Sequence, residues 1–218
     1  MKKYAFRMLI IFVLMLIIFD YVKASDSLSG RCIYLDPGHG GADPGAFYDV
    51  SEESINLSIA KKLKKELEKY GADVYLTRNG DYDLSSKDAK NRKRSDLYKR
   101  SRLINESKCD MYISLHLNAM KNSKWAGAQV FYDDINANNK AIAEIIQKEL
   151  KNQFKTNRKV MKLASGYLYK RIKIPGVLVE MGFISNYSER KKLKSEGYQN
   201  LMAKTIRKGI TSYFAKYQ

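Results

Sequence analysis

The sequence predicts a single α/β domain, and three observations support this fold class. Short apolar runs of strand length alternate with longer segments in which apolar residues recur every three or four positions. A strand, a helix and a second strand open the domain, which is the order of a parallel unit with a right-handed crossover. With 218 residues, 44% of them hydrophobic, the chain can bury a substantial core. We therefore expect a largely parallel sheet that helices cover on both faces.

The first 24 residues have the pattern of an export signal. Basic residues precede an apolar stretch over residues 8–19, and Ala24 ends a segment that resembles a cleavage site. The stretch is shorter than the roughly 20 residues that a membrane-spanning helix needs. We expect residues 1–24 to be a signal peptide, or an N-terminal membrane anchor where they are retained. Residues 25–218 are then the functional domain, outside the cytoplasm and in contact with the membrane only through this segment.

Apolar periodicity and breaker residues define the elements of the first half. A strand begins at Ile33 and is ended by Pro37 and Gly38. The next helix carries an apolar residue at every fourth position, at Ile55, Ile59, Leu63 and Leu67, and ends at Tyr70. Further strands are expected over residues 72–77 and 110–115, and a helix over residues 97–106. Residues 79–95 are polar and predict a long loop or an irregular helical start.

The second half continues the same alternation. We expect strands over residues 127–132 and 177–180 and a helix over residues 139–154. Apolar positions around Leu201 and Thr205 predict a terminal amphipathic helix. The sequence contains no internal repeat and no proline-rich linker, so a second domain is not expected.

The chain is strongly basic, with a net charge of +17. Residues 1–24 contain four basic side chains and one acidic side chain, a charge of +3, so residues 25–218 carry a net charge of +14. The densest run lies over residues 87–102 and would be a candidate nucleic-acid patch inside a cell. Its basic residues include Arg92, Lys93, Arg94, Lys99, Arg100 and Arg102. Export argues against nucleic acid and favours an anionic surface such as a cell wall, with simple solvation of helix faces as an equal alternative.

The two cysteines, Cys32 and Cys109, each stand seven positions before a histidine. If the two strands are parallel neighbours with their histidines at one level, the cysteines lie at one level too. Export would then permit a disulfide. We favour buried free thiols over this disulfide.

The chain contains only two histidines, and both are expected at the ends of strands. His39 lies on a glycine-rich loop after the first strand, and His116 ends a similar apolar run. Ligands of α/β sheets gather at this edge. Two imidazoles and a carboxylate suit catalytic zinc and leave a fourth position open. The loop lacks the ending of a phosphate-binding P-loop, and no His-Glu-x-x-His segment is present.

Two places along the chain supply candidate carboxylates. Glu52 and Glu53 stand just before the first helix, in the loop that begins at His39, and stabilisation of the helix dipole is the competing explanation for both. Glu180 ends the apolar run of a buried strand, where a glutamate is costly unless it is paired or functional. It is a candidate general base and proton donor, with an arginine ion pair as the alternative explanation.

Four segments together resemble the zinc-dependent N-acetylmuramoyl-L-alanine amidases of the amidase-3 type. They occur in the family's order and span nearly the whole chain after the signal. They are Leu35-Asp-Pro-Gly-His-Gly-Gly41, Glu52-Glu-Ser-Ile-Asn-Leu57, Ser114-Leu-His-Leu-Asn-Ala119 and Val177-Leu-Val-Glu-Met-Gly-Phe-Ile-Ser-Asn186. The resemblance implies a mixed sheet of about six strands flanked by helices, and Zn²⁺ as the cofactor.

The resemblance also implies a role for individual residues. His39, Glu52 and His116 correspond to the metal ligands, and Glu180 corresponds to the catalytic acid/base. Asn56 and Leu57 match the end of the family's second segment, and this alignment selects Glu52 rather than Glu53. Glu53 stands where the family usually has lysine, which leaves an exchange of ligand between the two glutamates open.

The implied activity is hydrolysis of the amide between the lactyl group of N-acetylmuramic acid and the L-alanine of the peptidoglycan stem peptide. The chain is similar in particular to small members that trim spore cortex peptidoglycan in sporulation and germination. Peptidoglycan is then the substrate, on the cell-wall or cortex side of the membrane, and an accessory or activating protein is a further expected partner. A non-catalytic peptidoglycan-binding protein with a vestigial site and a zinc carboxypeptidase acting on wall peptides are the alternatives.

Overall fold

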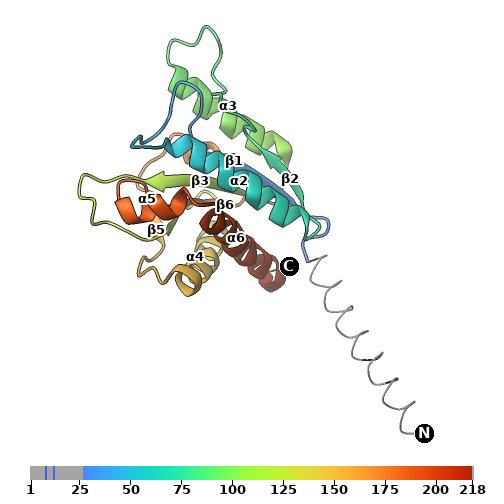
Figure 1. The fold of residues 1–218 in the computed structure, drawn as a ribbon. Coiled ribbons are helices and arrows are strands. Elements are labelled where there is room, and N and C mark those ends of the chain that lie inside the picture. Colours follow the sequence, from blue (N-terminus) through green and yellow to red (C-terminus); the bar gives the residue numbers. More distant parts are fainter. Residues whose placement is uncertain (1–7, 9–11, 13–26, 218) are drawn as a thin grey trace.

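The computed structural model describes residues 8, 12 and 27–217, so the signal or anchor expected over residues 1–24 lies outside the described domain. Residues 27–217 form one α/β domain around a six-stranded sheet with the order β2-β1-β3-β6-β4-β5 (Figure 1). The strands are β1 (Cys32–Pro37), β2 (Asp73–Leu76), β3 (Met111–Asn118), β4 (Gln129–Tyr132), β5 (Met161–Lys162) and β6 (Gly176–Phe183). The helices are α2 (Glu52–Glu68), α3 (Arg92–Ser107), α4 (Asn139–Phe154), α5 (Tyr187–Leu193), α6 (Glu196–Tyr217) and the short 3₁₀ helix η1 (Tyr169–Arg171).

The sheet is mixed and largely parallel, which confirms the expected fold class. Strands β2, β1, β3 and β6 are parallel neighbours, whereas β4 is antiparallel to β6 and pairs with the short parallel strand β5. The carboxyl ends of β1 and β3 therefore meet at one edge. None of the described helices combines the length and the apolar character that crossing a membrane requires.

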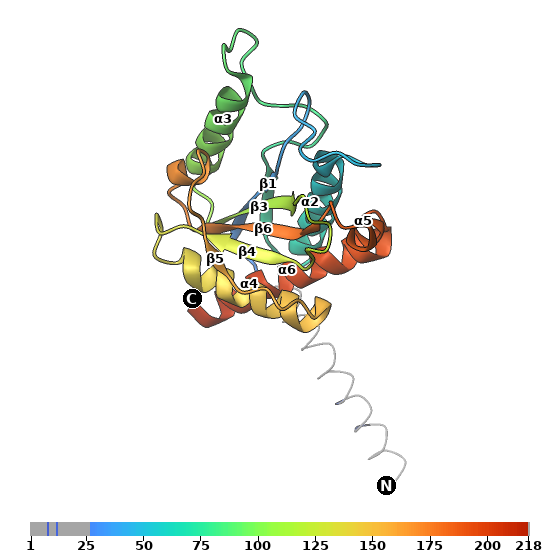
Figure 2. The same cartoon turned by 90° about the vertical axis from the view of Figure 1, so that its left-hand side faces the viewer.

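The two faces of the sheet differ because side chains alternate along each strand. Apolar residues of β1, β3 and β6, including Leu35, Ile113 and Val179, pack with α2, α4 and α6 in the main core. The other face carries a smaller apolar cluster in which Tyr34 and Tyr112 contact Ile104 of α3. Figure 2 shows α3 on one side of the sheet and α2 on the other. Asp36, Ser114, His116 and Glu180 alternate with the main-core residues, so they lie on the α3 face.

Several element boundaries differ from the expected ones. Helix α3 begins at Arg92 rather than at residue 97, because the Asn91 side chain caps it by accepting a hydrogen bond from the Arg94 amide at 2.9 Å. Glu52 is the first residue of α2 rather than part of the preceding loop. Strands β3 and β6 continue beyond His116 and Glu180, because a register shift after His116 absorbs one residue and lets the pairing go on.

A disulfide joins Cys32 and Cys109, so the preference for free thiols was wrong. Strands β1 and β3 are adjacent, and Ile33 is level with Met111. The cysteines are therefore offset by one position rather than level, yet their Cα atoms are 4.6 Å apart. This separation lies within the range that a disulfide bridges. Strand register, which decides the distance, was not available from the sequence.

Candidate active site

The candidate site lies just beyond the carboxyl end of β1. The last bond between β1 and β3 in this region runs from the Gly38 amide to the Leu115 carbonyl at 3.0 Å. The next residue of β3 is His116, whose ring occupies the space over Gly38. A Cβ atom at position 38 would overlap the ring atoms Cε1 and Nε2 of His116. A glycine is therefore required here for His116 to adopt its position.

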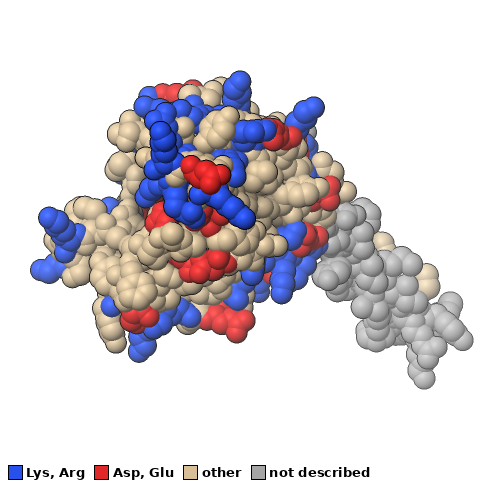
Figure 3. Space-filling view, turned by 90° about the horizontal axis from the view of Figure 1, so that it is seen from above, with Lys and Arg blue, Asp and Glu red and all other residues tan. Residues whose placement is uncertain are grey.

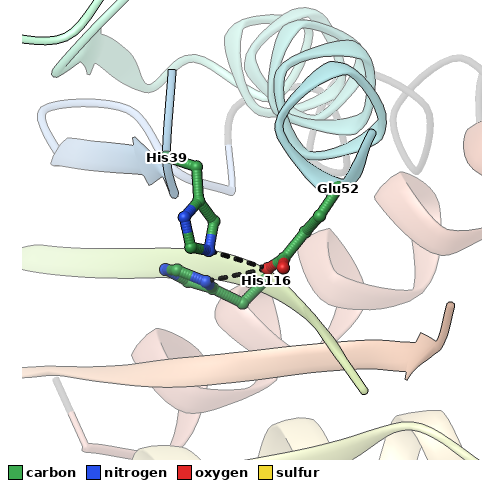
Figure 4. A group of neighbouring side chains, drawn as sticks. All are labelled: His39, Glu52 and His116. Carbon is green, nitrogen blue, oxygen red and sulfur yellow. Dashed lines mark hydrogen bonds and ion pairs between the residues drawn. The ribbon is translucent and has the colours of Figure 1, made fainter. Parts of the chain in front are cut away.

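Three of the predicted side chains converge at this point (Figure 4). His39 Nε2 lies 3.1 Å from Glu52 Oε1, and His116 Nδ1 lies 3.0 Å from the same oxygen. One ligand atom from each residue falls within 4.8 Å of the other two. Glu53 does not join them, because its carboxylate lies 3.5 Å from the guanidinium of Arg78. The geometry thus brings Glu52, and not Glu53, to the two histidines.

The carboxylate of Glu52 is held on both of its oxygens. The Leu117 amide donates to Oε1 at 3.0 Å, and the Ala46 amide donates to Oε2 at 3.0 Å. Burial acts to raise the pKa of Glu52, but hydrogen bonds and charge interactions with His116 and His39 outweigh it and hold the pKa well below its usual range. Glu52 is therefore an ionised carboxylate with a fixed orientation, as a metal ligand needs to be.

His39 is oriented by a residue that the sequence did not single out. Asp43 Oδ2 lies 3.0 Å from His39 Nδ1, on the far side of the ring from Glu52. Burial acts to lower the pKa of His39, but Glu52 and Asp43 raise it. A carboxylate on Nδ1 fixes the proton there and leaves Nε2 for a metal. The available signal was the position of Asp43 in the same glycine-rich loop, four residues after the histidine.

Glu180 is the cross-strand neighbour of His116. Its Oε2 atom is buried and has no hydrogen-bond partner among the described residues. None of the ion pairs within residues 27–217 includes Glu180, so the structure offers no support for the alternative of an arginine pair. Burial raises the pKa of Glu180 to about 7, with His116 opposing and Glu52 adding to the rise. A carboxyl group with this pKa can both accept and donate a proton near neutral pH.

A cleft of about 350 Å³ opens beside these residues. His39, His116, Leu178 and Glu180 line it on the sheet side. Its walls come from α3 and from residues 163–169. Viewed from above (Figure 3), Lys and Arg side chains gather around a smaller group of acidic ones. The volume is in the range typical of sites for small ligands or short peptide segments.

The donor set fits a divalent transition metal. Two imidazole nitrogens and one carboxylate oxygen converge from three different parts of the chain, and all belong to partly or fully buried side chains. Asp43 and the Leu117 amide support the ligands from outside, as is usual around protein metal sites. Three protein ligands leave one position open, which is the arrangement of a catalytic rather than a structural centre.

Comparison with known proteins agrees with the fold. The family profile described as N-acetylmuramoyl-L-alanine amidase, amidase-3, matches residues 33–212. The germination-specific N-acetylmuramoyl-L-alanine amidase of Bacillus subtilis is 40% identical, over 94% of this chain and 92% of its own length. The amidase LytC of the same organism is 35% identical, over 85% of this chain but only 36% of its own length.

Solved structures show the same relationship. The CwlD amidase from Clostridioides difficile, solved in complex with the GerS lipoprotein, has a TM-score of 0.82 and 39% identity, covering 86% of this chain and 100% of that one. A second N-acetylmuramoyl-L-alanine amidase, from Clostridium difficile 630, has a TM-score of 0.77 and 29% identity, covering 86% of this chain and 98% of that one. The chain described here therefore belongs to the amidase-3 family of N-acetylmuramoyl-L-alanine amidases.

Proposed function

We propose that the chain hydrolyses the amide between the lactyl group of N-acetylmuramic acid and the L-alanine of the stem peptide, with Zn²⁺ held by His39, Glu52 and His116. The observation that carries the proposal is the convergence of these three ligand atoms within 4.8 Å, next to Glu180, whose buried Oε2 atom has no hydrogen-bond partner among the described residues. The cleft beside them is lined by His39, His116 and Glu180, so a peptide that enters it meets these three side chains.

The spacing of two pairs of donor atoms is compatible with zinc. Zn–N and Zn–O distances near 2.0–2.2 Å place the ligand atoms of a tetrahedral site about 3.3 Å apart. The two separations from Glu52 Oε1, 3.1 Å to His39 Nε2 and 3.0 Å to His116 Nδ1, are close to this value. When bound, zinc would polarise the amide carbonyl and lower the pKa of a water molecule.

The residues of the chain account for the remaining steps. Glu180 accepts the proton of the attacking water as the new C–O bond forms at the lactyl carbonyl carbon. It then delivers this proton to the alanine nitrogen as the C–N bond breaks, so the products are a lactyl carboxylic acid and a peptide with a free amino terminus. In the metal-free site burial raises the pKa of Glu180 to about 7, so its carboxyl group is suited to gain and lose a proton near neutral pH. Asp43 and the Leu117 amide keep His39 and Glu52 in place throughout.

The test combines metal analysis with product analysis. Purified protein is assayed for bound zinc, and purified peptidoglycan is digested with and without added zinc and examined by mass spectrometry. The proposal predicts stoichiometric zinc and new peptides that begin with L-alanine. A zinc carboxypeptidase would instead shorten the peptides from their other end and leave the lactyl amide intact. Protein that binds peptidoglycan and zinc but releases no peptide, under conditions where a related amidase does, would favour the non-catalytic alternative.

We infer further that the enzyme is exported through residues 1–24 and acts on spore cortex peptidoglycan with an accessory protein. The name of the germination-specific relative supports the cortex role, and the GerS complex of CwlD supports a partner. Rates on cortex and vegetative peptidoglycan can be compared directly, and equal rates would argue against a cortex role. Cross-linking of the tagged protein in its host, followed by mass spectrometry, tests the partner; recovery of the chain alone would contradict it.

A further inference from the structure

Two arginines are buried next to the candidate site. The exposed fraction of Arg78 is 0% and that of Arg100 is 1%, and both are among the largest fully buried side chains of the described residues. The sequence grouped Arg100 with the exposed basic run over residues 87–102, and this was wrong. Burying a guanidinium is costly unless its hydrogen-bonding groups find partners, so the partners indicate its role.

Both arginines bind the backbone of the loop that carries His39. Arg78 donates from Nε to the Pro37 carbonyl at 3.0 Å and from Nη2 to the Gly38 carbonyl at 2.9 Å. Arg100 donates from Nη1 to the Pro37 carbonyl at 2.8 Å and from Nη2 to the His39 carbonyl at 2.6 Å. The two rigid, planar guanidinium groups therefore hold the backbone carbonyls of Pro37, Gly38 and His39.

Arg100 is itself fixed by two carboxylates. Asp96, one turn earlier in α3, accepts from Nε at 2.8 Å, and Asp36 of β1 accepts from Nη1 at 2.8 Å. Asp36 also accepts from the hydroxyl groups of Thr77 at 2.7 Å and Ser114 at 2.9 Å. Ser114 lies two residues before His116. The Arg100–Asp36 pair thus connects the His39 loop with the strand that carries the second histidine.

Arg78 makes the corresponding connection to the third ligand. It donates to the backbone carbonyl of Glu53 at 2.9 Å and approaches the Glu53 carboxylate at 3.5 Å. Glu53 follows Glu52 directly in the first turn of α2. The Arg78 guanidinium therefore binds both the first turn of α2 and the His39 loop.

The loop needs such support because its backbone is strained. His39 has φ of 65°, in the left-handed region that a residue with a side chain seldom adopts. Conformations of this kind cost on the order of 1–3 kcal/mol and persist where the surroundings determine them. A metal ligand must also lie within about 0.2 Å of its ideal distance. A loop that left this conformation would carry the His39 ring away from Glu52 and His116.

We propose that Arg78 and Arg100 are positioning residues that hold the backbone of residues 37–39 and thereby set His39 for metal binding. The inference rests on the proposed zinc site. Each arginine acts through the loop carbonyls and is not one of the three metal ligands. Lysine at either position keeps the charge but loses the planar fork, so it reaches one carbonyl where arginine reaches two.

The experiment compares R78K and R100K with the control R102K. Arg102 lies on the same helix as Arg100, is 57% exposed and pairs only with Glu106 within the described residues. Zinc affinity is measured by competition with a chromophoric chelator, and the free energy of unfolding of the metal-free proteins by urea titration. We expect zinc affinity to fall by about 10- to 100-fold in R78K and R100K, the range typical for residues that orient metal ligands, and to stay unchanged in R102K.

Each other outcome has a distinct meaning. Folded R78K and R100K that bind zinc as tightly as the wild type, even with reduced stability, would overturn the positioning role and leave the zinc site intact. A wild-type protein that binds no zinc would instead refute the proposed function.

A measurement on the wild-type protein covers the case in which the variants do not fold. In the metal-free chain we expect slow hydrogen exchange at two loop amides. The Gly38 amide donates to the Leu115 carbonyl at 3.0 Å, and the Gly40 amide donates to the Asp43 backbone carbonyl at 2.8 Å. Exchange as fast as in an exposed loop would show that the loop is not held in advance, and would contradict the proposal.

Discussion

Replacement of Gly38 by alanine adds one methyl group at the point where β1 gives way to the His116 ring. The new Cβ would overlap Cε1 and Nε2 of His116, and the ring would have to move by more than about 1 Å to restore ordinary contact. This displacement is several times the tolerance of about 0.2 Å on a metal–ligand distance. Gly38 is not in the left-handed region, so the methyl group rather than the backbone causes the effect. We expect G38A to bind zinc about 100-fold more weakly, or worse, and to lose turnover in parallel.

The assay is a chelator competition for zinc together with release of L-alanine-terminated peptides from peptidoglycan. G197A is the matched control, because a Cβ atom on Gly197, at the start of α6, would meet nothing within 4 Å. Its zinc affinity and rate should equal those of the wild type. Urea unfolding of the metal-free proteins separates a displaced ligand from a general loss of structure. If folded G38A retained zinc affinity and rate within two-fold of the wild type, the account of how His116 is placed would be refuted.

Three further predictions concern individual carboxyl groups. E180Q should keep its zinc affinity and lose turnover by about 10²- to 10⁴-fold, because only the proton carrier is removed; a near-normal rate would remove Glu180 from the mechanism. D43A should bind zinc about 10-fold more weakly, whereas D43N, whose amide oxygen still accepts from His39 Nδ1, should lie closer to the wild type in the same chelator titration; equal affinities in all three proteins would contradict the orienting role. Burial acts to raise the pKa of Asp36, but Arg100 and the Thr77 hydroxyl outweigh burial and hold this pKa below its ordinary value of 3.8. The ionised Asp36 carboxylate therefore stabilises the fold above pH 3.8, and this stabilisation is lost as the pH falls through the lowered pKa. Urea unfolding should therefore show that D36N is much less stable than the wild type at pH 7, and that the difference in unfolding free energy becomes smaller towards pH 3. A difference that stays constant with pH would contradict this prediction.

The fold could be predicted from periodicity within each element. Ile59 and Leu63 mark the buried side of α2, and Ile113 and Leu115 mark the main-core face of β3. The scarcity of histidine, and its position after two similar apolar runs, pointed to the edge of the sheet where His39 and His116 meet Glu52. The choice of Glu52 over Glu53 came from the amidase-3 resemblance, since the physical argument for a helix N-terminus applied to both.

The remaining features depend on contacts between elements, which periodicity does not contain. Strand register decided the Cys32–Cys109 disulfide, and the continuation of β6 beyond Glu180 depended on its pairing with β3. Arg100 looks in the sequence like its exposed basic neighbours, and only its packing against Asp36 shows that it is buried. The two-residue strand β5 is too short to produce any pattern.

The direction of β1 determines how far the cleft lies from the point where the chain enters the domain. The chain enters the domain at the amino end of this strand, and the cleft opens beyond its carboxyl end, roughly 20 Å away at about 3.3 Å per residue for six residues. If residues 1–24 stay in a membrane as an anchor, the site lies at the opposite end of β1 from the point where the chain enters the domain. The short stretch between the anchor and Cys32 then sets the depth of wall that one tethered molecule can cut, and lengthening this stretch would extend the zone of cleavage without altering the site.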